Sequence, residues 1–470
     1  MGDVADVMGA RSRPERADHP LGSICSDTRS LQPGQTFLAL RGERFDGHRF
    51  CAQAVAGGAG ALIVDDRYEP PADLPPIPIL RVEDTVRAYG DLAAEVRRRW
   101  GGPVLAVSGS AGKTTTRRLV GAALGSHRNV LEAERNYNNL IGVPHTLLRL
   151  RPEHEIAVLE LGMNQPGELG RLAEIAGPTA ALLTQIGVAH VGMFRTMQEL
   201  IDAKLDMFRG CASGTPLAIN AACARTQLAI PPFAEGRRIV RFLGDRPPAW
   251  PGPVDVRIEA IHPIKPYGYR FDLVAGSQKM EGLTLRLFGR HHVENVAAAV
   301  ALLTAAGQPA AWIGEALADF QGEPLRGEVI HHNGHTLILD CYNASPGGML
   351  GAIEALAEWP EPGRRVLVLA DMLELGPQTR IAHQMLLEPL RHLGPTVLLA
   401  LGPECTAIAQ TLAAEGWSAE GFETREDLIA RLEQTLREGD VVLFKGSRGF
   451  ALERVAGSLT RQGAPDPSAP

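Results

Sequence analysis

A glycine-rich loop followed by a lysine and a threonine is the stretch of this chain best suited to chemistry. Residues 104–107 are apolar and predict a buried strand, and residues 113–125 have helical spacing. The loop between them, Gly109–Gly112, leaves room for backbone N–H groups and a helix N-terminus to surround an anion. Lys113 suits the β- and γ-phosphates and Thr114 suits Mg²⁺, which favours a nucleotide triphosphate site over an ordinary strand-to-helix turn. The residues expected around the phosphates are Ser108, Gly109, Ser110, Ala111, Gly112, Lys113, Thr114 and Thr115.

Two further polar side chains follow neighbouring predicted strands. Glu160 lies near the end of the apolar run 155–161, and His190 comes after the strand predicted at 179–184. The carboxyl ends of parallel strands meet at one edge of a sheet, so both side chains are expected near the phosphates. An unpaired buried carboxylate is costly, which favours a metal ligand at Glu160. The histidine fits a structural role equally well, and Lys204, on a predicted helix, would by itself be a surface lysine.

Length and composition limit the fold and the partners. A chain of 470 residues exceeds one hydrophobic core and suggests about three domains. A net charge of −7 argues against nucleic acid as a partner. No apolar run approaches the ~20 residues of a membrane span and no signal segment is visible, so we expect a cytoplasmic protein without stable membrane insertion. The six cysteines lack C-x-x-C spacing and suit a reducing compartment, and the charge predicts a monomer.

The order of predicted elements indicates an α/β protein of three domains. Residues 1–101 alternate short strands and helices until Gly101-Gly102-Pro103 breaks the pattern, which predicts a small α/β domain. Residues 102–318 repeat strand–helix units around the phosphate loop and predict a doubly wound, mostly parallel sheet, with an antiparallel part at about 240–288. Residues 319–470 carry four more strands with helices between them, a Rossmann-like pattern without a G-x-G-x-x-G motif.

These segments together resemble the ATP-dependent Mur ligase family of peptidoglycan synthesis, from about residue 24 to 457. Short strings carry the resemblance: Ser26-Asp-Thr-Arg29, Asn138-Asn-Leu-Ile-Gly-Val-Pro144, Glu160-Leu-Gly162, Ala189-His190, Ala203-Lys204, Gly289-Arg-His291, Asp340-Cys-Tyr-Asn-Ala344, Asp371-Met-Leu-Glu-Leu-Gly376 and Lys445-Gly-Ser-Arg-Gly449. Tyr-Asn-Ala and Asp-Met-Leu-Glu-Leu-Gly indicate the branch that adds D-alanyl-D-alanine. The Asp-Asn-Pro-Arg string of the diaminopimelate-adding branch is absent.

The resemblance implies an ATP-dependent amide ligase. Its N-terminal domain would bind a UDP-N-acetylmuramoyl-tripeptide, its central domain ATP, and its C-terminal domain D-alanyl-D-alanine. ATP would phosphorylate the peptide carboxylate, and the dipeptide amine would then displace phosphate. Because a carboxylate must approach a polyanion, Lys113 and two Mg²⁺ ions are expected to offset the repulsion.

The resemblance also assigns roles to residues. The catalytic group is Lys113, Glu160, His190 and Lys204, and the metal ligands are Thr114, Glu160, His190 and an N-carbamylated Lys204. Besides the phosphate loop, the ATP contacts are His291, Asn295, Arg326 and Asp340. The substrate contacts are Ser26, Asp27, Thr28, Arg29, Phe45, Asp46, His48, Asn138, Asn139, Tyr342 and Asn343. Turn chemistry and helix capping would explain many of these polar residues equally well.

Some positions depart from the family pattern, and two other functions stay open. Gly192 stands where relatives often have glutamate, Gln185 where asparagine is usual, and His292 where asparagine commonly follows Gly-Arg-His. None of these removes a predicted phosphate or metal ligand. One alternative is another amide ligase of the same superfamily, adding diaminopimelate, lysine or glutamate to its acceptor. The other is a nucleotide-dependent switch or binding protein that hydrolyses ATP without joining anything.

Overall fold

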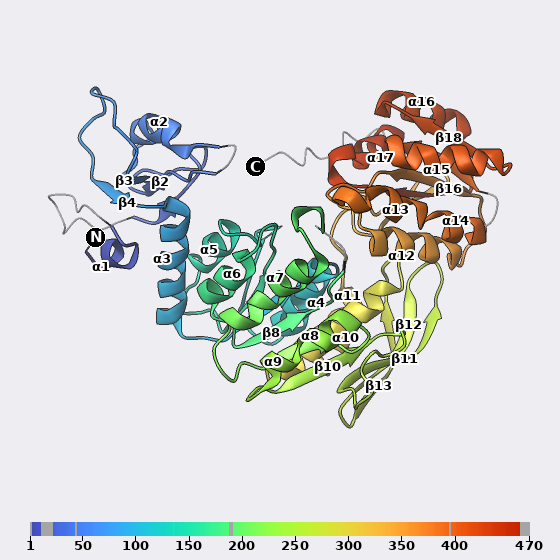
Figure 1. Cartoon of the computed structure of the whole chain (residues 1–470), viewed down its shortest axis with the longest axis horizontal. Coiled ribbons are helices and arrows are strands. Elements are labelled where there is room, and N and C mark those ends of the chain that lie inside the picture. The colour runs from blue at the N-terminus through green and yellow to red at the C-terminus, as the bar shows by residue number, and fades with distance from the viewer. Residues whose placement is uncertain are drawn as a thin grey trace.

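The structure, a computed structural model, describes residues 2–10, 22–42, 45–134, 136–187, 191–393 and 396–460. The described strands form three sheets of four, nine and six strands. The N-terminal and C-terminal sheets lie at opposite ends of the molecule with the central sheet between them (Figure 1). The protein is therefore built from three α/β domains as predicted, while the limits 1–101, 102–318 and 319–470 remain predictions. None of the described helices combines the length and the apolar character that a bilayer crossing requires.

The first sheet is parallel, with strands in the order β1-β2-β3-β4. Its strands are β1 (Ile24–Cys25), β2 (Thr36–Leu38), β3 (Ala61–Asp65) and β4 (Ile79–Val82), and its helices are α1 (Gly2–Val7), η1 (Gly47–Phe50), α2 (Cys51–Ala56) and α3 (Thr85–Trp100). Asp84 begins α3 by accepting hydrogen bonds from the N–H groups of Val86 and Arg87. Gly101, at φ 74°, ends the helix in the left-handed conformation that favours glycine.

The central sheet has the order β13-β12-β11-β10-β9-β8-β5-β7-β6. Its strands are β5 (Val104–Ser108), β6 (Val130–Glu132), β7 (Ile156–Glu160), β8 (Ala180–Leu183), β9 (Leu217–Asn220), β10 (Ile239–Leu243), β11 (Val256–Pro263), β12 (Tyr269–Ala275) and β13 (Gln278–Leu285). Its helices are α4 (Lys113–Gly125), α5 (Gly142–Leu147), α6 (Glu168–Ala176), η2 (Val191–Met193), α7 (Met197–Gly210), α8 (Ala224–Ala229), α9 (Pro231–Ala234), α10 (His291–Ala305) and α11 (Trp312–Asp319).

Both faces of this central sheet are buried, as expected for a doubly wound fold. Leu105 and Val107 of β5 belong to an apolar cluster shared with α4 and α10, whereas Val104 and Ala106 belong to one shared with α6 and α7. The prediction of an antiparallel region at about 240–288 is wrong at its start. Strand β10 pairs in parallel with β9, because α8 and α9 form a crossover between the two strands, and it also pairs in parallel with β11. In this sheet the antiparallel pairs are β11–β12 and β12–β13.

The third sheet has the order β14-β15-β19-β16-β17-β18 and is parallel except for the β14–β15 pair. Its strands are β14 (Glu328–His332), β15 (His335–Leu339), β16 (Arg365–Ala370), β17 (Val397–Leu401), β18 (Ser418–Phe422) and β19 (Val441–Lys445). Its helices are α12 (Pro346–Ala357), η3 (Gly376–Gln378), α13 (Thr379–Gln384), α14 (Leu387–Leu393), α15 (Pro403–Ala414), α16 (Arg425–Thr435), η4 (Arg448–Phe450) and α17 (Leu452–Thr460).

The central and C-terminal domains make direct contact near the end of α12. The Trp359 ring stacks on Tyr267 at 6.0 Å between centroids, and the Arg290 guanidinium lies 3.3 Å from the Glu358 carboxylate. These contacts join the end of α12 to the β11–β12 loop and to the residue before α10 of the central domain.

Candidate active site

The predicted phosphate loop joins β5 to α4 and packs tightly against its surroundings. A Cβ at Gly109, where φ is 141°, would lie 1.9 Å from Thr184 Oγ1, and one at Gly112, where φ is 79°, would lie 2.3 Å from Asn295 Oδ1. Glycine is therefore required at both positions. In the described part of the chain α4 begins with a glycine cap and not a side-chain cap, so its first N–H groups are available to an anion.

A buried carboxylate lies beside this loop because β5 and β7 are neighbouring parallel strands. Glu160 is only 3% exposed, and its Oε2 accepts a hydrogen bond from Thr114 Oγ1 at 2.8 Å. Its Oε1 accepts a hydrogen bond from Asn138 Nδ2, also at 2.8 Å. Lys113 Nζ donates to the Gly109 carbonyl oxygen at 2.9 Å, which folds this side chain back over the loop. Oxygen donors and an ammonium thus meet where phosphates would bind.

Lys113 and Lys204 both have a lowered pKa. Burial lowers the pKa of Lys113, an effect that the nearby Glu160 carboxylate opposes. Lys204, on α7, is 2% exposed, and burial together with the charge of Lys113 lowers its pKa to about 7. At neutral pH a large part of Lys204 therefore carries the unprotonated amine, the form that reacts with CO₂.

A cavity of about 490 Å³ lies between the central and C-terminal domains and includes the phosphate loop and Glu160. On its C-terminal side, Lys445 Nζ lies 3.0 Å from Asp340 Oδ2 and donates to the Asn343 carbonyl oxygen at 2.8 Å. The Arg326 guanidinium lies 4.3 Å from the centroid of the Tyr342 ring. Cations and hydrogen-bonding groups from two domains therefore surround one space.

The start of α10 contributes two histidines to the same cavity, the buried His292 and the half-buried His291. The rings of His291 and His292 lie 4.2 Å apart, and burial lowers the pKa of both, so they are neutral at pH 7. His292 Nδ1 lies 3.4 Å from Asn295 Nδ2. This histidine, which departs from the family pattern, thus lines the predicted nucleotide site beside a predicted contact.

The structure brings most of the predicted residues together. The cavity is lined by Ser110, Ala111, Gly112, Lys113, Thr114, Thr115, Asn138, Asn139, Glu160, His291, Asn295, Arg326, Asp340, Tyr342 and Asn343. Ser108 and Gly109 begin the loop behind the cavity. Lys204 lies close enough to Lys113 for the charge of Lys113 to lower its pKa. His190, a predicted catalytic and metal-binding residue, lies outside the described residues.

The predicted substrate residues of the N-terminal domain lie apart from this cavity. Ser26, Asp27, Thr28 and Arg29 follow β1, and the Asp27 carboxylate pairs with Arg29 at 2.7 Å. Phe45 is 55% exposed and stacks on Phe50 at 5.6 Å.

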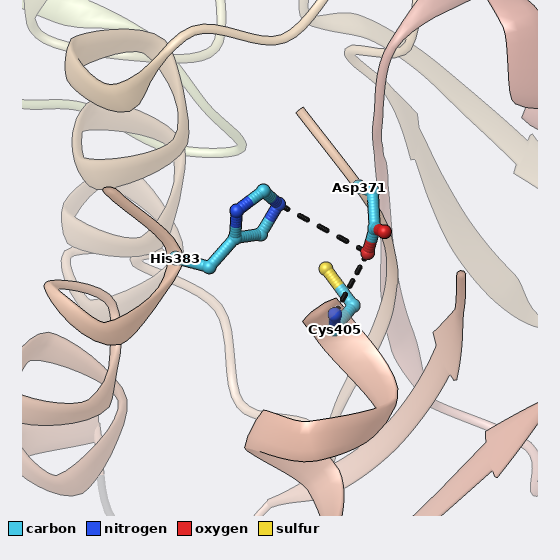
Figure 2. A group of neighbouring side chains, drawn as sticks. All are labelled: Asp371, His383 and Cys405. Atoms are coloured by element: carbon cyan, nitrogen blue, oxygen red, sulfur yellow. Dashed lines mark hydrogen bonds and ion pairs between the residues drawn. The ribbon is translucent and has the colours of Figure 1, made fainter. Parts of the chain in front are cut away.

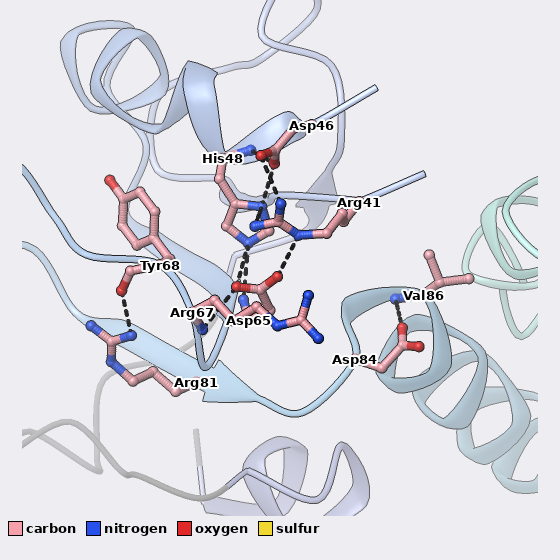
Figure 3. Close-up of polar contacts among 9 residues, drawn as sticks. All are labelled: Arg41, Asp46, His48, Asp65, Arg67, Tyr68, Arg81, Asp84 and Val86. Carbon is pink, nitrogen blue, oxygen red and sulfur yellow. Dashed lines mark hydrogen bonds and ion pairs between the residues drawn. The ribbon is translucent and has the colours of Figure 1, made fainter. Parts of the chain in front are cut away.

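His48 is engaged within the N-terminal domain (Figure 3). Its Nδ1 pairs with Asp46 Oδ1 at 2.7 Å, and its Nε2 accepts the backbone N–H of Asp65 at 2.9 Å. Arg41 joins the Asp46 and Asp65 carboxylates at 2.9 and 2.6 Å. Both ring nitrogens of His48 are therefore used by the fold, and its contact with substrate stays a prediction.

Sequence reasoning gave no role to a buried group in the C-terminal domain: Asp371, His383 and Cys405 (Figure 2). Its polar atoms could suggest a metal site, but they are already paired. His383 Nδ1 donates to the Thr379 carbonyl oxygen at 2.6 Å, and Nε2 accepts the Met372 N–H at 2.9 Å. The Asp371 carboxylate accepts the Cys405 N–H at 2.7 Å. The group therefore fixes the loop 371–376, whose residues Leu373–Leu375 line the cavity.

Three cavity residues near β19 were also missing from the predicted site: Lys445, Ser447 and Arg448. The Lys445-Gly-Ser-Arg-Gly449 string was the signal that could have found them. It follows a buried strand at the same sheet edge as Asp340, since β19 pairs with β15 in parallel.

Comparison with known proteins agrees with this arrangement. The chain matches three family descriptions: "Mur ligase family, catalytic domain" over residues 21–97, "Mur ligase middle domain" over 107–303 and "Mur ligase, glutamate ligase domain" over 325–448. It is 37% identical to the UDP-N-acetylmuramoyl-tripeptide–D-alanyl-D-alanine ligase of Escherichia coli (strain K12), covering 98% of both chains. The chain belongs to the Mur ligase family.

Solved structures of related Mur ligases have the same architecture. This Mur ligase superposes on MurF from Acinetobacter baumannii with a TM-score of 0.86, at 30% identity and with 98% of both chains covered. The MurF ligase of Thermotoga maritima, solved in complex with ADP, superposes with a TM-score of 0.79 at 26% identity, covering 94% of this chain and 97% of that one.

The described residues of this Mur ligase suit Mg²⁺. Thr114 Oγ1 and Glu160 Oε2 are hard oxygen donors 2.8 Å apart at the start of α4. Both line the cavity next to Lys113. This donor set, beside a phosphate-binding helix terminus, fits an ion bound jointly by protein and nucleotide.

Proposed function

We propose that this Mur ligase uses ATP to join D-alanyl-D-alanine to UDP-N-acetylmuramoyl-tripeptide, which gives the pentapeptide precursor of peptidoglycan. The observation that carries the proposal is the cavity in which the phosphate loop and Glu160 face Arg326, Asp340 and Lys445 of the C-terminal side. The printed name of the E. coli relative describes this reaction, and 37% identity over nearly the whole chain supports the transfer.

In the first step the tripeptide carboxylate attacks the γ-phosphorus of ATP, and ADP leaves. Lys113 and the N-terminal N–H groups of α4 would hold the phosphates and offset the repulsion between the two anions. Thr114 and Glu160 would bind one Mg²⁺, and Glu160 and His190 would contribute to a second. Lys204 would be N-carbamylated and so provide an anionic oxygen ligand. Bound Mg²⁺ supplies charge neutralisation on the transferred phosphoryl group.

In the second step the dipeptide amine attacks the acyl carbon of the acyl phosphate, and the tetrahedral intermediate expels phosphate. Tyr342 and Asn343 line the cavity on the side of the C-terminal domain and would contact the dipeptide. His291, Asn295, Arg326 and Asp340 would contact ATP. Enclosure between two domains would protect the acyl phosphate from water.

The N-terminal domain would bind the UDP-sugar part of the tripeptide substrate through the predicted residues after β1 and around Phe45. Asn138 and Asn139 would face the sugar peptide from the central domain. Because the reaction consumes ATP and a UDP-linked precursor, we place it in the cytoplasm, and we propose that the enzyme acts as a monomer.

The decisive experiment measures phosphate release from ATP and Mg²⁺ while the sugar tripeptide and D-alanyl-D-alanine are each omitted in turn. We expect release to require both, with a UDP-muramoyl-pentapeptide product seen by mass spectrometry. Release that needs the sugar peptide and another amine, but not the dipeptide, would replace the amine substrate with that of a sister ligase. Release that needs neither would favour the ATP-hydrolysing switch.

A further inference from the structure

A buried arginine lies one helical turn beyond the phosphate-loop lysine. Arg117 follows Lys113 by four residues on α4, so the two share a helix face. Only 2% of Arg117 is exposed, which places it among the largest fully buried side chains described. Burying a guanidinium is costly unless carboxylates or carbonyls surround it, so its partners indicate its role.

The partners of Arg117 come from three separate segments. Its Nη1 donates to Glu132 Oε1 at 2.5 Å and also to the Ala133 carbonyl oxygen, on and after β6. Its Nη2 lies 3.7 Å from Glu323 Oε1, in the linker between α11 and β14. Its Nε lies 4.0 Å from Glu160 Oε2, the proposed metal-binding oxygen. One side chain therefore joins the nucleotide helix, an edge strand, the interdomain linker and the metal-site carboxylate.

Arg117 Nε lies too far from Glu160 Oε2 to form a hydrogen bond. Among the described residues Arg117 Nε has no hydrogen-bond partner, although the nitrogen is buried. At 4.0 Å it attracts the carboxylate without occupying the oxygen that Thr114 and a metal would use. An arginine at hydrogen-bond distance would compete with the metal for that oxygen.

Glu323 belongs to a turn of the linker that also carries Arg326, a predicted ATP contact. The Arg326 N–H donates to the Glu323 carbonyl oxygen at 3.2 Å, which closes a turn over residues 323–326. Arg326 lines the cavity with its guanidinium over Tyr342. The side chain that holds Glu323 thus also sets where this turn presents Arg326.

We propose that Arg117 is a positioning residue that couples the metal-site carboxylate Glu160 to the linker turn carrying Arg326. It touches neither nucleotide nor metal; it fixes the groups that do. The inference rests on the proposed use of ATP, but it concerns only nucleotide binding and is independent of which amine is joined.

The test measures ADP affinity by calorimetry, with Mg²⁺ and with a chelator, beside ATP kinetics. Arg117→Lys keeps the charge but loses the planar fork that reaches several partners at once. We expect it to weaken ADP binding with Mg²⁺ and to lower kcat/KM for ATP by about 10–100-fold, the usual effect of losing an outer-shell partner. The loss should shrink with the chelator, because Glu160 then binds no metal.

Glu323→Gln tests the contact between Arg117 and the linker turn separately from the contact with Glu160. It leaves Glu160 and Arg117 in place, so ADP affinity should fall equally with and without Mg²⁺, and KM for ATP should rise while kcat changes less. Arg118→Met is the matched control, because Arg118 also pairs with Glu323, at 3.4 Å, but is partly exposed. We expect less than about a fivefold change there, as for an exposed ion pair.

The outcomes distinguish this inference from the proposed function. Wild-type protein that binds no ADP with Mg²⁺ would overturn the proposed use of ATP. If Arg117→Lys and Glu323→Gln both bind ADP as tightly as the wild-type protein does, the coupling is overturned and the proposed use of ATP is not. If Arg117→Lys does not fold, as shown by its thermal transition, Glu323→Gln decides the question by itself.

Discussion

The amines of Lys113 and Lys204 are electrostatic neighbours in the proposed active site. Burial disfavours the cationic form of both, and the charge of Lys113 contributes to the lowered pKa of Lys204, about 7. In the unfolded chain the Lys204 amine would titrate near its ordinary value of 10.5. The environment that makes the Lys204 cation costly also favours the neutral amine, which carbamylation requires.

We predict that Lys204→Met stabilises the CO₂-depleted, metal-free protein most at low pH. Between about pH 7 and pH 10.5 the unfolded state binds the proton and the folded state does not, so wild-type stability rises with pH there. Below that window both states are protonated and the burial penalty is complete. Melting temperatures at about pH 6, 8 and 10 should show the gain shrinking with pH. A difference between Lys204→Met and wild type that stays constant across this pH range would contradict the prediction.

Glu160→Gln tests whether the Glu160 carboxylate binds Mg²⁺, as we propose. The amide keeps the size and can still accept a hydrogen bond from Thr114, but it removes the charge that is proposed to hold Mg²⁺ beside the phosphates. Metal-ion charge stabilisation contributes several kcal/mol, so ligase activity should fall by about 100-fold or more. Glu155→Gln is the control, because Glu155 pairs with Arg128 at the surface and should leave activity within about twofold. Equal activity in the two variants would remove Glu160 from the metal site.

At the scale of elements, one backbone contact joins η2 of the central domain to the loop before η3. The Gly192 N–H donates to the Glu374 carbonyl oxygen at 3.2 Å. A Cβ at Gly192 would lie 2.7 Å from Gly376 N and 2.8 Å from Glu374 O. Glutamate, which the family resemblance leads one to expect here, would not fit this close approach, so glycine at 192 matches a contact that this chain makes.

We therefore expect Gly192→Glu to separate the two elements. Overpacking of this kind costs about 1–3 kcal/mol, which would lower the melting temperature. Because Leu373–Leu375 line the cavity, KM for the dipeptide should also rise. Gly125→Glu is a matched control, since a Cβ there meets nothing within 4 Å and a surface change costs at most about 0.5 kcal/mol. Identical melting and kinetics in the two variants would show that the contact has no role.

At the scale of the whole molecule, the proposed UDP-sugar site and the cavity proposed to bind ATP lie in different parts of the protein. The N-terminal sheet lies at one end of the molecule, and the cavity lies between the central and C-terminal domains (Figure 1). None of the predicted N-terminal substrate residues lines that cavity. A substrate held by its UDP group in the first domain must therefore still deliver its carboxylate to the phosphate loop.

We predict that the domains draw together only when both ligands are present. Small-angle X-ray scattering should show a smaller radius of gyration with the sugar tripeptide and a non-hydrolysable ATP analogue together than with either alone. Each single ligand contacts mainly one domain, so it supplies little free energy for closure. A radius that is unchanged by the pair would mean that the substrate spans the distance without domain movement.

Local chemistry explains which parts of this protein could be predicted from sequence. The phosphate loop and Glu160 were predictable because strand, glycines and helix occur in the order that phosphate binding needs, and parallel strands bring their ends together. Residues in one continuous motif were therefore easier to place than residues whose meaning depends on folding.

Three features were beyond the sequence for a physical reason. Arg117 resembles any charged helix residue until Glu132 and Glu323 converge on it from distant segments. The structural role of His48 depends on Asp46 and Asp65, which pair with its two ring nitrogens only in the folded chain, while its contact with substrate stays a prediction. Strand β10 alternates like an antiparallel strand, but its direction is fixed by the crossover before it.

The long helix α3 has a consequence for where this chain can be divided. Its first half packs under the N-terminal sheet, through Ala88 and Tyr89. Its second half is fastened to the central domain: Arg97 donates to the carbonyl oxygens of Ala176 and Gly177, and Trp100 Nε1 to that of His154. A fragment that begins at Gly101 would lack α3 and would expose the part of the central domain that α3 covers. A fragment that begins at Asp84 would keep α3 and this surface would stay covered.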